Sequence, residues 1–295
     1  MWWTLLKLLT AITVYGTAVE PRFVIRNNEE ARIPGLPAAW RGKQFAVFAD
    51  MQVGMWWANR DAVRRAVGKV VDVHPAFVLI AGDFVYNADS SVDEQMKEVV
   101  ELLQPILRDS IPIYAVLGNH DYSLMNEHSN QENYVAHRVR AALTIAGVEV
   151  MDNAAHALTQ PGTPVSPGDS LYLVGIGEKW ANNDDVESVL GTVPPSAPRI
   201  VFMHDPDSFV KIPAGQAPFA VAAHTHGMQL GIPFLSDYLW HHHFSDEAMG
   251  VEGWQRDRGQ AGNAVYVTRG IGFSIVPARI HAAPEVTVFT LEPGP

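Results

Sequence analysis

Short apolar runs alternate with segments of helical spacing along the first half of the chain. The runs with the length of a buried strand are Gln44–Asp50, Ala76–Ala81 and Ile111–Leu117. The segments with apolar residues on one helical face are Asn59–Val73, Val92–Leu107 and Gln131–Ala146. This alternation of strand and helix predicts parallel strands with helices packed on the faces of the sheet.

The second half of the chain changes character, because its apolar runs are short and little besides Asn183–Leu190 has helical spacing. The further strand candidates are Val148–Met151, Ser170–Ile176, Arg199–His204, Ala217–His224, Asn263–Thr268 and Glu285–Leu291. Two sheets packed together, with helices outside, accommodate both halves. The sequence therefore predicts one α/β domain over residues 44–292.

Residues 1–19 are largely apolar, and Lys7 is their single charge. One face of the predicted helix is formed by Leu5, Leu8, Leu9, Ile12 and Val19. With Trp2 and Trp3 at its start, this pattern favours an anchor or interfacial helix at a cell membrane. The alternatives are a cleaved signal peptide of a secreted or periplasmic protein and a helix packed on the domain. Residues 20–43 contain several prolines and have no period, so a linker is expected there.

Composition narrows the class of function. The chain has 295 residues, 47% of them apolar and 18% charged, and its formal net charge is −11. Such an excess of carboxylates would repel phosphate backbones, so a general nucleic-acid-binding function is excluded. The chain contains no cysteine, which excludes disulfides, thiolate nucleophiles and cysteine-ligated metal sites.

Polar residues directly follow five of the predicted strands. They are Asp50-Met51-Gln52, Gly82-Asp83, Gly118-Asn119-His120-Asp121, His204-Asp205 and His224-Thr225-His226. Open α/β sheets place their sites at strand ends, so these side chains are expected at one edge. Carboxylate, amide and imidazole groups without thiolate suit Mn, Fe, Zn or Mg. Gly82 and Gly118 are expected to let the backbone turn sharply, so that the next side chain points into the cleft.

In this order the pattern resembles that of the calcineurin-like metallophosphoesterase superfamily, which is D-x-H, GD, GNH[DE], H and GH-x-H. It is most similar to the bacterial YkuE- and YaeI-like branch, through the hydrophobic N-terminus, the proline-containing segment, His224–Gln229 and Arg269–Gly272. The resemblance covers residues 42–291. It implies a four-layer α-β-β-α sandwich and a hydrolase that uses two divalent metal ions.

The resemblance also implies roles for single residues. The ligands would be Asp50 and His226 for the first ion, Asp83 as a bridge, and Asn119, His204 and His224 for the second ion. His120 would stand beside the substrate phosphate and stabilise developing charge or protonate the leaving oxygen. Asp121 would orient the His120 ring.

One departure from the family pattern is Gln52, which stands where D-x-H has its histidine. An amide oxygen suits Mn or Mg better than Zn or Fe, so Mn is the expected metal, with Fe, Zn and Mg as alternatives. If Gln52 binds metal, the first site is expected to be weaker than the usual family site. The alternative is that Gln52 faces the substrate and never touches metal.

Two further residues are expected to contact substrate. Arg269 would hold a phosphate, and His242 would belong to a lid or acyl-chain contact, with a plain surface loop as the alternative. The expected reaction is hydrolysis of a phosphodiester or pyrophosphate bond. A lipid-linked substrate such as UDP-2,3-diacylglucosamine, on which members of the related family act, fits the apolar N-terminus. The alternatives are a phosphodiesterase for soluble nucleotides or small diesters and a catalytically weakened membrane-associated binding protein.

Overall fold

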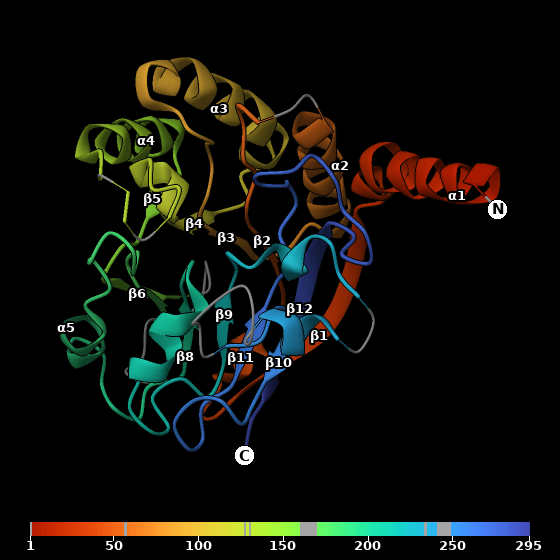
Figure 1. The fold of residues 1–295 in the computed structure, drawn as a ribbon. Helices are drawn as coiled ribbons and strands as arrows, with labels where there is room; N and C mark the ends of the chain where they lie inside the picture. The colour runs from red at the N-terminus through yellow and green to blue at the C-terminus, as the bar shows by residue number, and fades with distance from the viewer. Residues whose placement is uncertain are drawn as a thin grey trace.

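Two six-stranded sheets pack face to face, and helical segments cover the outer face of each sheet (Figure 1). The computed structural model describes residues 2–55, 58–126, 128–129, 131–159, 170–232, 235–240 and 249–295. One apolar cluster lies between the two sheets. A second cluster lies between the first sheet and its helices, and a third lies between the second sheet and its helices. The predicted four-layer α-β-β-α sandwich is confirmed.

The first sheet has the strand order β1-β12-β2-β3-β4-β5. Its strands are β1 (Ile25–Ile33), β2 (Gln44–Phe48), β3 (Phe77–Ala81), β4 (Ile113–Val116), β5 (Glu149–Val150) and β12 (Glu285–Pro293). Strands β2 to β5 are parallel, whereas β12 runs antiparallel to β2 and parallel to β1. The helices on the outer face are α2 (Ala58–Val73), α3 (Val92–Arg108) and α4 (Asn133–Ala146).

Strand β2 shows why the sequence has continuous apolar runs here. Ala46 and Phe48 pack in the cluster under the helices, whereas Phe45 belongs to the cluster between the sheets. The Phe45 ring stacks on Phe77 of β3, with 5.0 Å between the ring centroids. A strand covered on both faces needs apolar residues at successive positions, so alternation disappears.

The second sheet has the order β10-β11-β9-β8-β7-β6. Its strands are β6 (Ala154–Leu158), β7 (Leu171–Gly175), β8 (Arg199–Phe202), β9 (Ala220–Ala222), β10 (Gly253–Gln255) and β11 (Val265–Val267). Helix α5 (Val186–Gly191) and the 3₁₀ segment Pro206–Lys211 pack on its outer face. The short helix α6 (Ser236–Leu239) precedes β10 in the chain.

The predicted strands and helices are present within a few residues of their expected ends, whereas β1, β6 and β10 were not predicted. The expectation of a linker over residues 20–43 was wrong, because β1 pairs along its whole length with β12. Only Ala31 and Ile33 of β1 are buried, and exposed polar residues alternate with half-buried ones before them. A polar edge strand of this kind leaves no apolar run in the sequence.

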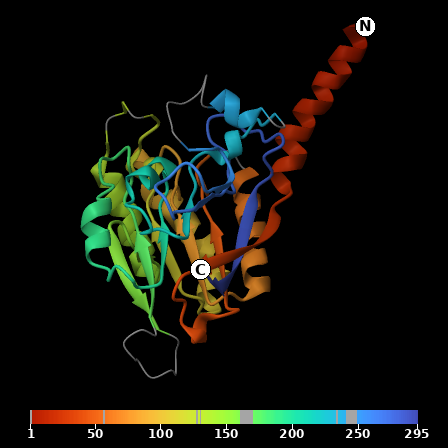
Figure 2. The same ribbon diagram turned by 90° about the horizontal axis from the view of Figure 1, so that it is seen from below.

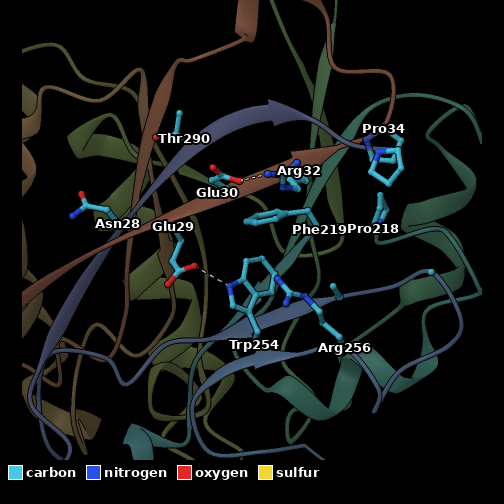
Figure 3. Close-up of a pocket in the computed structure, with 13 residues that line it drawn as sticks. Asn28, Glu29, Glu30, Arg32, Pro34, Pro218, Phe219, Trp254, Arg256 and Thr290 are labelled. Carbon is cyan, nitrogen blue, oxygen red and sulfur yellow. Dashed lines mark hydrogen bonds and ion pairs between the residues drawn. The ribbon is translucent and has the colours of Figure 1, made fainter.

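The edge strands β1 and β10 lie on the same side of the sandwich. The indole N–H of Trp254 in β10 donates to Glu29 in β1 at 3.0 Å, and the Arg256 guanidinium lies 4.6 Å from the centre of the Trp254 ring (Figure 3). The groove that they line also includes Pro218 and Ala264, which precede β9 and β11. It therefore lies at the opposite strand ends from the predicted site.

Helix α1 (Trp2–Val14) has no buried residue and projects from the body (Figure 2). One π-helical turn, Tyr15–Val19, and one 3₁₀ turn, Glu20–Arg22, connect it to β1. Within the described ranges, no helix combines the length and the apolar character needed to cross a membrane. The membrane contact expected for residues 1–19 stays a prediction.

Candidate metal centre

The predicted ligands meet at the carboxyl ends of five strands. Asp50 and Gln52 follow β2, Asp83 follows β3, Asn119 follows β4, His204 follows β8, and His224 and His226 follow β9. All of them are buried except His224, which is half-buried. Ligand atoms of Asp50, Asp83 and His204 lie within 4.8 Å of one another. This edge of the sandwich therefore holds a dense polar cluster above an apolar core.

Five of the seven predicted ligands have a strained, left-handed backbone. The φ angles of Asp50, Gln52 and Asp83 are 56°, 49° and 58°, and those of His224 and His226 are 72° and 52°. Left-handed conformations of non-glycine residues cost of order 1–3 kcal/mol each and persist only where the surroundings enforce them. Part of the enforcement is mutual, since the Gln52 N–H donates to the Asp83 carbonyl at 3.0 Å. Strain concentrated on the ligands indicates a functional site.

Gly82 and Gly118 serve the site in different ways. Gly82 has a φ of 88°, so the predicted sharp turn is present. Gly118 is extended, with a φ of −106°, and does not make the turn that we expected. A Cβ atom on Gly118 would lie 2.2 Å from Asp83 Oδ1. Glycine is required at position 118 because the carboxylate occupies that space.

The amide oxygen of Asn119 and ring nitrogens of His204 and His224 lie close together. His204 Nδ1 donates to the Ala81 carbonyl at 2.7 Å, and the Asn119 amide nitrogen donates to the Leu124 carbonyl at 2.7 Å. Against the effect of burial, the neighbouring Asp83 raises the pKa of His204, so the ring is a cation whose Nε2 lies 3.1 Å from Asn119 Oδ1 and 3.4 Å from Asp83 Oδ2. His224 Nδ1 lies 3.0 Å from the same Asn119 oxygen. Imidazole nitrogens and an amide oxygen thus converge on one place, where a divalent ion would displace the His204 proton, so this half of the cluster fits a divalent ion.

The other half of the cluster is less complete. Both carboxylate oxygens of Asp50 are buried without a hydrogen-bond partner, as expected for the side chain of a metal ligand. His226 Nε2 lies 3.8 Å from Asp50 Oδ1, while His226 Nδ1 lies 3.3 Å from the Gly272 carbonyl. The Gln52 amide nitrogen donates to Asp83 Oδ2 at 2.6 Å, and its amide oxygen is buried without a partner. Asp50, His226 and the Gln52 oxygen are the donors available here.

Burial and neighbouring charges give the two aspartates different protonation. Burial raises the pKa of Asp50 to about 7, against the opposing effect of His204. Burial acts on Asp83 too, but the positive charge of His204, whose Nε2 lies 3.4 Å from Asp83 Oδ2, outweighs it and lowers the pKa of Asp83. Asp83 is therefore an anion between the two halves, whereas Asp50 keeps its proton near neutral pH until a cation displaces it.

His120 lies between the ligands and the cavity. Its backbone N–H donates to Asp83 Oδ1 at 2.9 Å, and its ring packs on Tyr86 with 4.9 Å between centroids. Its Nε2 lies 3.3 Å from Ser274 Oγ, whereas its Nδ1 is buried without a partner. Burial lowers the pKa of His120, so the ring is neutral at pH 7 and carries one N–H.

Asp121 has a different role from the one predicted. Its carboxylate accepts the backbone N–H groups of Asp83, Phe84, Val85 and Gly118 at 2.9–3.2 Å. With its acceptor sites used in this way, it does not orient the His120 ring. Asp121 instead fixes the turn that carries Asp83, so it is a positioning residue.

Sequence analysis missed Arg279, a fully buried arginine behind Asp50 and His226. Its guanidinium donates to the carbonyl oxygens of Arg269, Gly272 and Ala282 at 2.7–3.0 Å, and to that of His226 at 3.3 Å. Burial, together with this cation, lowers the pKa of His226, which keeps the imidazole in its neutral, metal-binding form. No sequence pattern marked this role, because a single arginine between two strands carries no period.

The two substrate contacts predicted from sequence have different outcomes. Arg269 donates to Glu285 at 2.6 Å, lies 3.4 Å from Glu252, and does not line the cavity. The prediction that Arg269 holds a phosphate was therefore wrong, because acidic side chains already pair with its charge. His242 lies outside the described residues.

A cavity of about 460 Å³ opens above the cluster. Its floor contains Asp83, Asn119, His120, His224 and His226. Its walls are largely apolar and include Met125, Trp180, Met228, Leu230, Ile232, Leu239, Trp240, Ile275 and Val276. The Trp180 ring meets the His224 ring edge-on, with 4.8 Å between centroids. The cavity thus divides into a polar floor and apolar walls.

Comparison with known proteins agrees with this geometry. The family model for calcineurin-like phosphoesterases matches residues 43–228, a range that contains every predicted metal ligand. The chain is 24% identical over 287 residues to the uncharacterized metallophosphoesterase YkuE of Bacillus subtilis, covering 96% of this chain and 92% of YkuE. It is 27% identical over 231 residues to phosphodiesterase YaeI of Escherichia coli, covering 77% and 74% of the two chains.

A third relative is the UDP-2,3-diacylglucosamine pyrophosphatase LpxG of Chlamydia muridarum, which is 21% identical over 310 residues, covering 93% of this chain and 91% of LpxG. The match of the family model extends over more than half of the chain, and these relatives align along most of its length. The chain therefore belongs to the calcineurin-like phosphoesterase family and is a hydrolase of phosphoester bonds.

Proposed function

We propose that this enzyme hydrolyses a phosphodiester or pyrophosphate bond in an amphiphilic, lipid-linked substrate at a membrane. The observation that carries the proposal is the division of the cavity into a polar floor and apolar walls. A phosphoester with an acyl chain would place its phosphate on the floor and its chain against the walls. The relative LpxG is named for such a compound, UDP-2,3-diacylglucosamine.

The donors support a centre for two divalent ions. Asp50, Gln52 and His226 would hold the first ion, Asn119, His204 and His224 would hold the second, and Asp83 would contact both. Bound there, the two ions would acidify a water and neutralise the phosphate oxygens during an in-line displacement. Carboxylate and amide oxygens make up more than half of this set, which favours Mn, with Mg, Fe and Zn as alternatives.

His120 supplies the clearest catalytic contribution of the chain itself. It lines the cavity floor, and its backbone is fixed to Asp83. Because burial lowers the pKa of His120, the neutral ring has one N–H to donate to a phosphate oxygen. A preorganised donor at that place stabilises the negative charge that develops on the oxygen. Charge stabilisation is therefore its proposed role, ahead of proton transfer to the leaving group.

The N-terminal helix supports the membrane part of the proposal. Its side chains Leu5, Leu6, Leu8, Leu9 and Ile12 are exposed, and the exposed Trp2 and Trp3 stand in its first turn. Apolar helices with terminal tryptophans partition to the membrane interface. Membrane association through residues 1–19 is accordingly part of the proposed function.

A comparison of matched substrates tests the proposal. Purified protein is stripped with a chelator, reloaded with Mn, and assayed on a nucleoside diphosphate linked to an acylated sugar in detergent micelles. The control substrate is the same compound without its acyl chains. We expect a higher kcat/KM for the acylated compound. Equal or better turnover of the deacylated compound or of soluble nucleotides would instead identify a soluble phosphodiesterase, and no turnover of any ester would indicate a binding protein.

A further inference from the structure

Two loops beside the cavity are joined into one unit. The Gln229 side chain donates to the carbonyls of Ser274 and Val276 at 3.0 and 2.6 Å and accepts the Ser274 N–H at 2.8 Å. The Ile280 N–H donates to the Gln229 carbonyl at 2.9 Å, and the Gly231 N–H donates to the Ile280 carbonyl at 2.7 Å. The loop after β9 and the loop before β12 are therefore held in one fixed relation.

The base of α1 is attached to the same unit. The Arg279 N–H donates to the Gly16 carbonyl at 2.8 Å, and a Cβ atom on Gly16 would lie 2.7 Å from the Ile280 side chain. The Ala282 N–H donates to the Glu20 carboxylate at 2.7 Å. Figure 2 shows α1 leaving the body beside the blue loop that precedes β12. The direction of α1 is thus set by the loop that also forms the cavity wall.

Around the mouth of the cavity, this unit and α6 expose apolar side chains, which we call the rim. The rim consists of Leu230, Ile232, Leu235, Tyr238, Ile275 and Val276, which are between 40% and 76% exposed. A patch of this kind on a soluble surface marks an interaction site. Since α1 is anchored directly beside it, the rim and α1 are parts of one apolar surface.

The hydroxyl groups of α1 indicate what covers this surface. Thr10, Thr13 and Thr17 each donate their hydroxyl to the backbone carbonyl four residues earlier, at 2.7–2.9 Å. The hydroxyl donors of Thr10 and Thr13 in α1, and of Thr17 in the π-helical turn that follows, are therefore satisfied internally, as those of threonines are in helices surrounded by lipid. A protein groove would cover one face of α1, whereas lipid can surround a helix with no buried residue.

The charge pattern points to the same partner. The chain has 32 acidic residues and a net charge of −11, yet no acidic residue occurs in 1–19, 226–236 or 269–284. These are the segments of α1, of the first rim loop with the start of α6, and of the second rim loop; Asp237 in α6 is the one acidic residue of the sequence between the rim positions 230 and 238. An anionic membrane would repel most of the protein surface but not this one.

We propose that the rim docks, together with α1, on the surface of an anionic phospholipid bilayer, so that the cavity mouth opens on the lipid headgroup layer. This inference rests on the proposed function, because it describes how a lipid-linked phosphoester reaches the metal centre. The rim is a second membrane contact beyond α1. Its contribution is to orient the mouth toward the substrate.

The test uses the metal-loaded, full-length protein and vesicles of phosphatidylcholine with phosphatidylglycerol. The rim variant carries Leu235→Glu and Tyr238→Glu, two positions outside the cavity lining. The control is Ile145→Glu, since Ile145 is 87% exposed on α4, away from the rim. In cosedimentation we expect the rim variant to lose about tenfold or more in vesicle partition, because two apolar contacts become charged. The control should bind as the wild type does.

Activity measurements separate this inference from the proposed function. The rim variant should hydrolyse a water-soluble phosphodiester at the wild-type rate and the same headgroup on a vesicle-embedded lipid several times more slowly. Wild-type vesicle partition by the rim variant would overturn the docking surface even if the enzyme proved active on lipids. A change from dimer to monomer in light scattering of the rim variant would also overturn it, by assigning the surface to a second copy. Cosedimentation needs no turnover, so an inactive enzyme would contradict the proposed function alone.

Discussion

The two halves of the metal centre are built differently. In the second half, backbone carbonyls fix the Asn119 amide and the His204 ring, so the donors already face one another. In the first half, Asp50 has two buried oxygens without partners, and Gln52 donates its amide nitrogen to the shared Asp83. Asp50 in the first half and His204 in the second must each lose a proton on binding a cation, but the second half keeps its geometry, whereas Gln52 in the first half must rearrange. The two ions are therefore expected to bind with different strengths.

The largest effect is expected where the two halves meet. Replacing Asp83 with Ala removes the anion between them, so turnover should fall by more than about 100-fold, the loss that outer-shell changes alone can cause. Total bound metal, measured by elemental analysis, should fall below one ion per chain. Asp72→Ala, an exposed position on α2, is the matched control and should change neither value. Substantial activity of the Asp83 variant would contradict a shared centre.

Replacing Gln52 with His should make the metal affinities of the two halves more alike. Gln52→His supplies a second imidazole to the first half, so its metal affinity should rise by about 10–100-fold and its preference should move from Mn toward Zn or Fe. Calorimetric titration of the stripped protein with each metal measures both changes. Unchanged affinity and preference would show that Gln52 faces the substrate and does not bind metal.

Acidity should weaken metal binding in both halves, because Asp50 in the first and His204 in the second each hold a proton that a cation must displace. Burial raises the pKa of Asp50 to about 7, so below that pH a metal ion must displace its proton. Affinity of the weaker site should rise by about tenfold per pH unit up to pH 7 and then level off. The raised pKa also destabilises the metal-free fold as the pH rises from the unfolded value of 3.8 through 7. The melting temperature of stripped protein should fall between pH 5 and pH 8, as measured at about one-unit intervals, while that of loaded protein should not.

The smallest effect on metal binding is expected from a change at Arg279, which lies behind the Asp50 and His226 side chains of the first half. Arg279→Lys keeps a positive charge but loses most of the bonds to the four backbone carbonyls, including that of His226. Metal affinity of the weaker site should fall severalfold, since partners behind a ligand orient it. The tighter site should be unaffected in the same titration. Equal weakening of both sites would indicate a general loss of structure.

The sequence predicted which side chains lie together at this edge, because each candidate ligand comes shortly after an apolar strand. Parallel strands end at a common edge, so Asp50, Asp83 and Asn119 could be placed together without a structure. The strained backbone of Asp50, Asp83 and His224 could not be predicted, since left-handed backbone at an aspartate or histidine has no sequence signal. The requirement for glycine at position 118 could not be predicted either, because it arises from the Asp83 carboxylate, which follows another strand.

The wrong and missing predictions share a physical cause. The partners of Asp121 and Arg269 come from distant segments or from backbone groups, and neither leaves a pattern in the sequence. Arg279 was missed for the same reason, because its role depends on hydrogen bonds to backbone carbonyls, which the sequence does not show. Strand β1 was missed because a polar edge strand looks like a linker until β12 is seen beside it.

A stepwise metal titration tests most directly whether the centre binds two ions with different affinities. Stripped wild-type protein is titrated with Mn in a calorimeter, with turnover of a soluble phosphodiester followed in parallel. We expect two binding events of unequal affinity, with activity appearing during the weaker one. His226→Ala should remove only the weaker event, and His204→Ala should remove the tighter one. A single binding event, or full activity after the first ion, would contradict a two-ion centre with unequal halves.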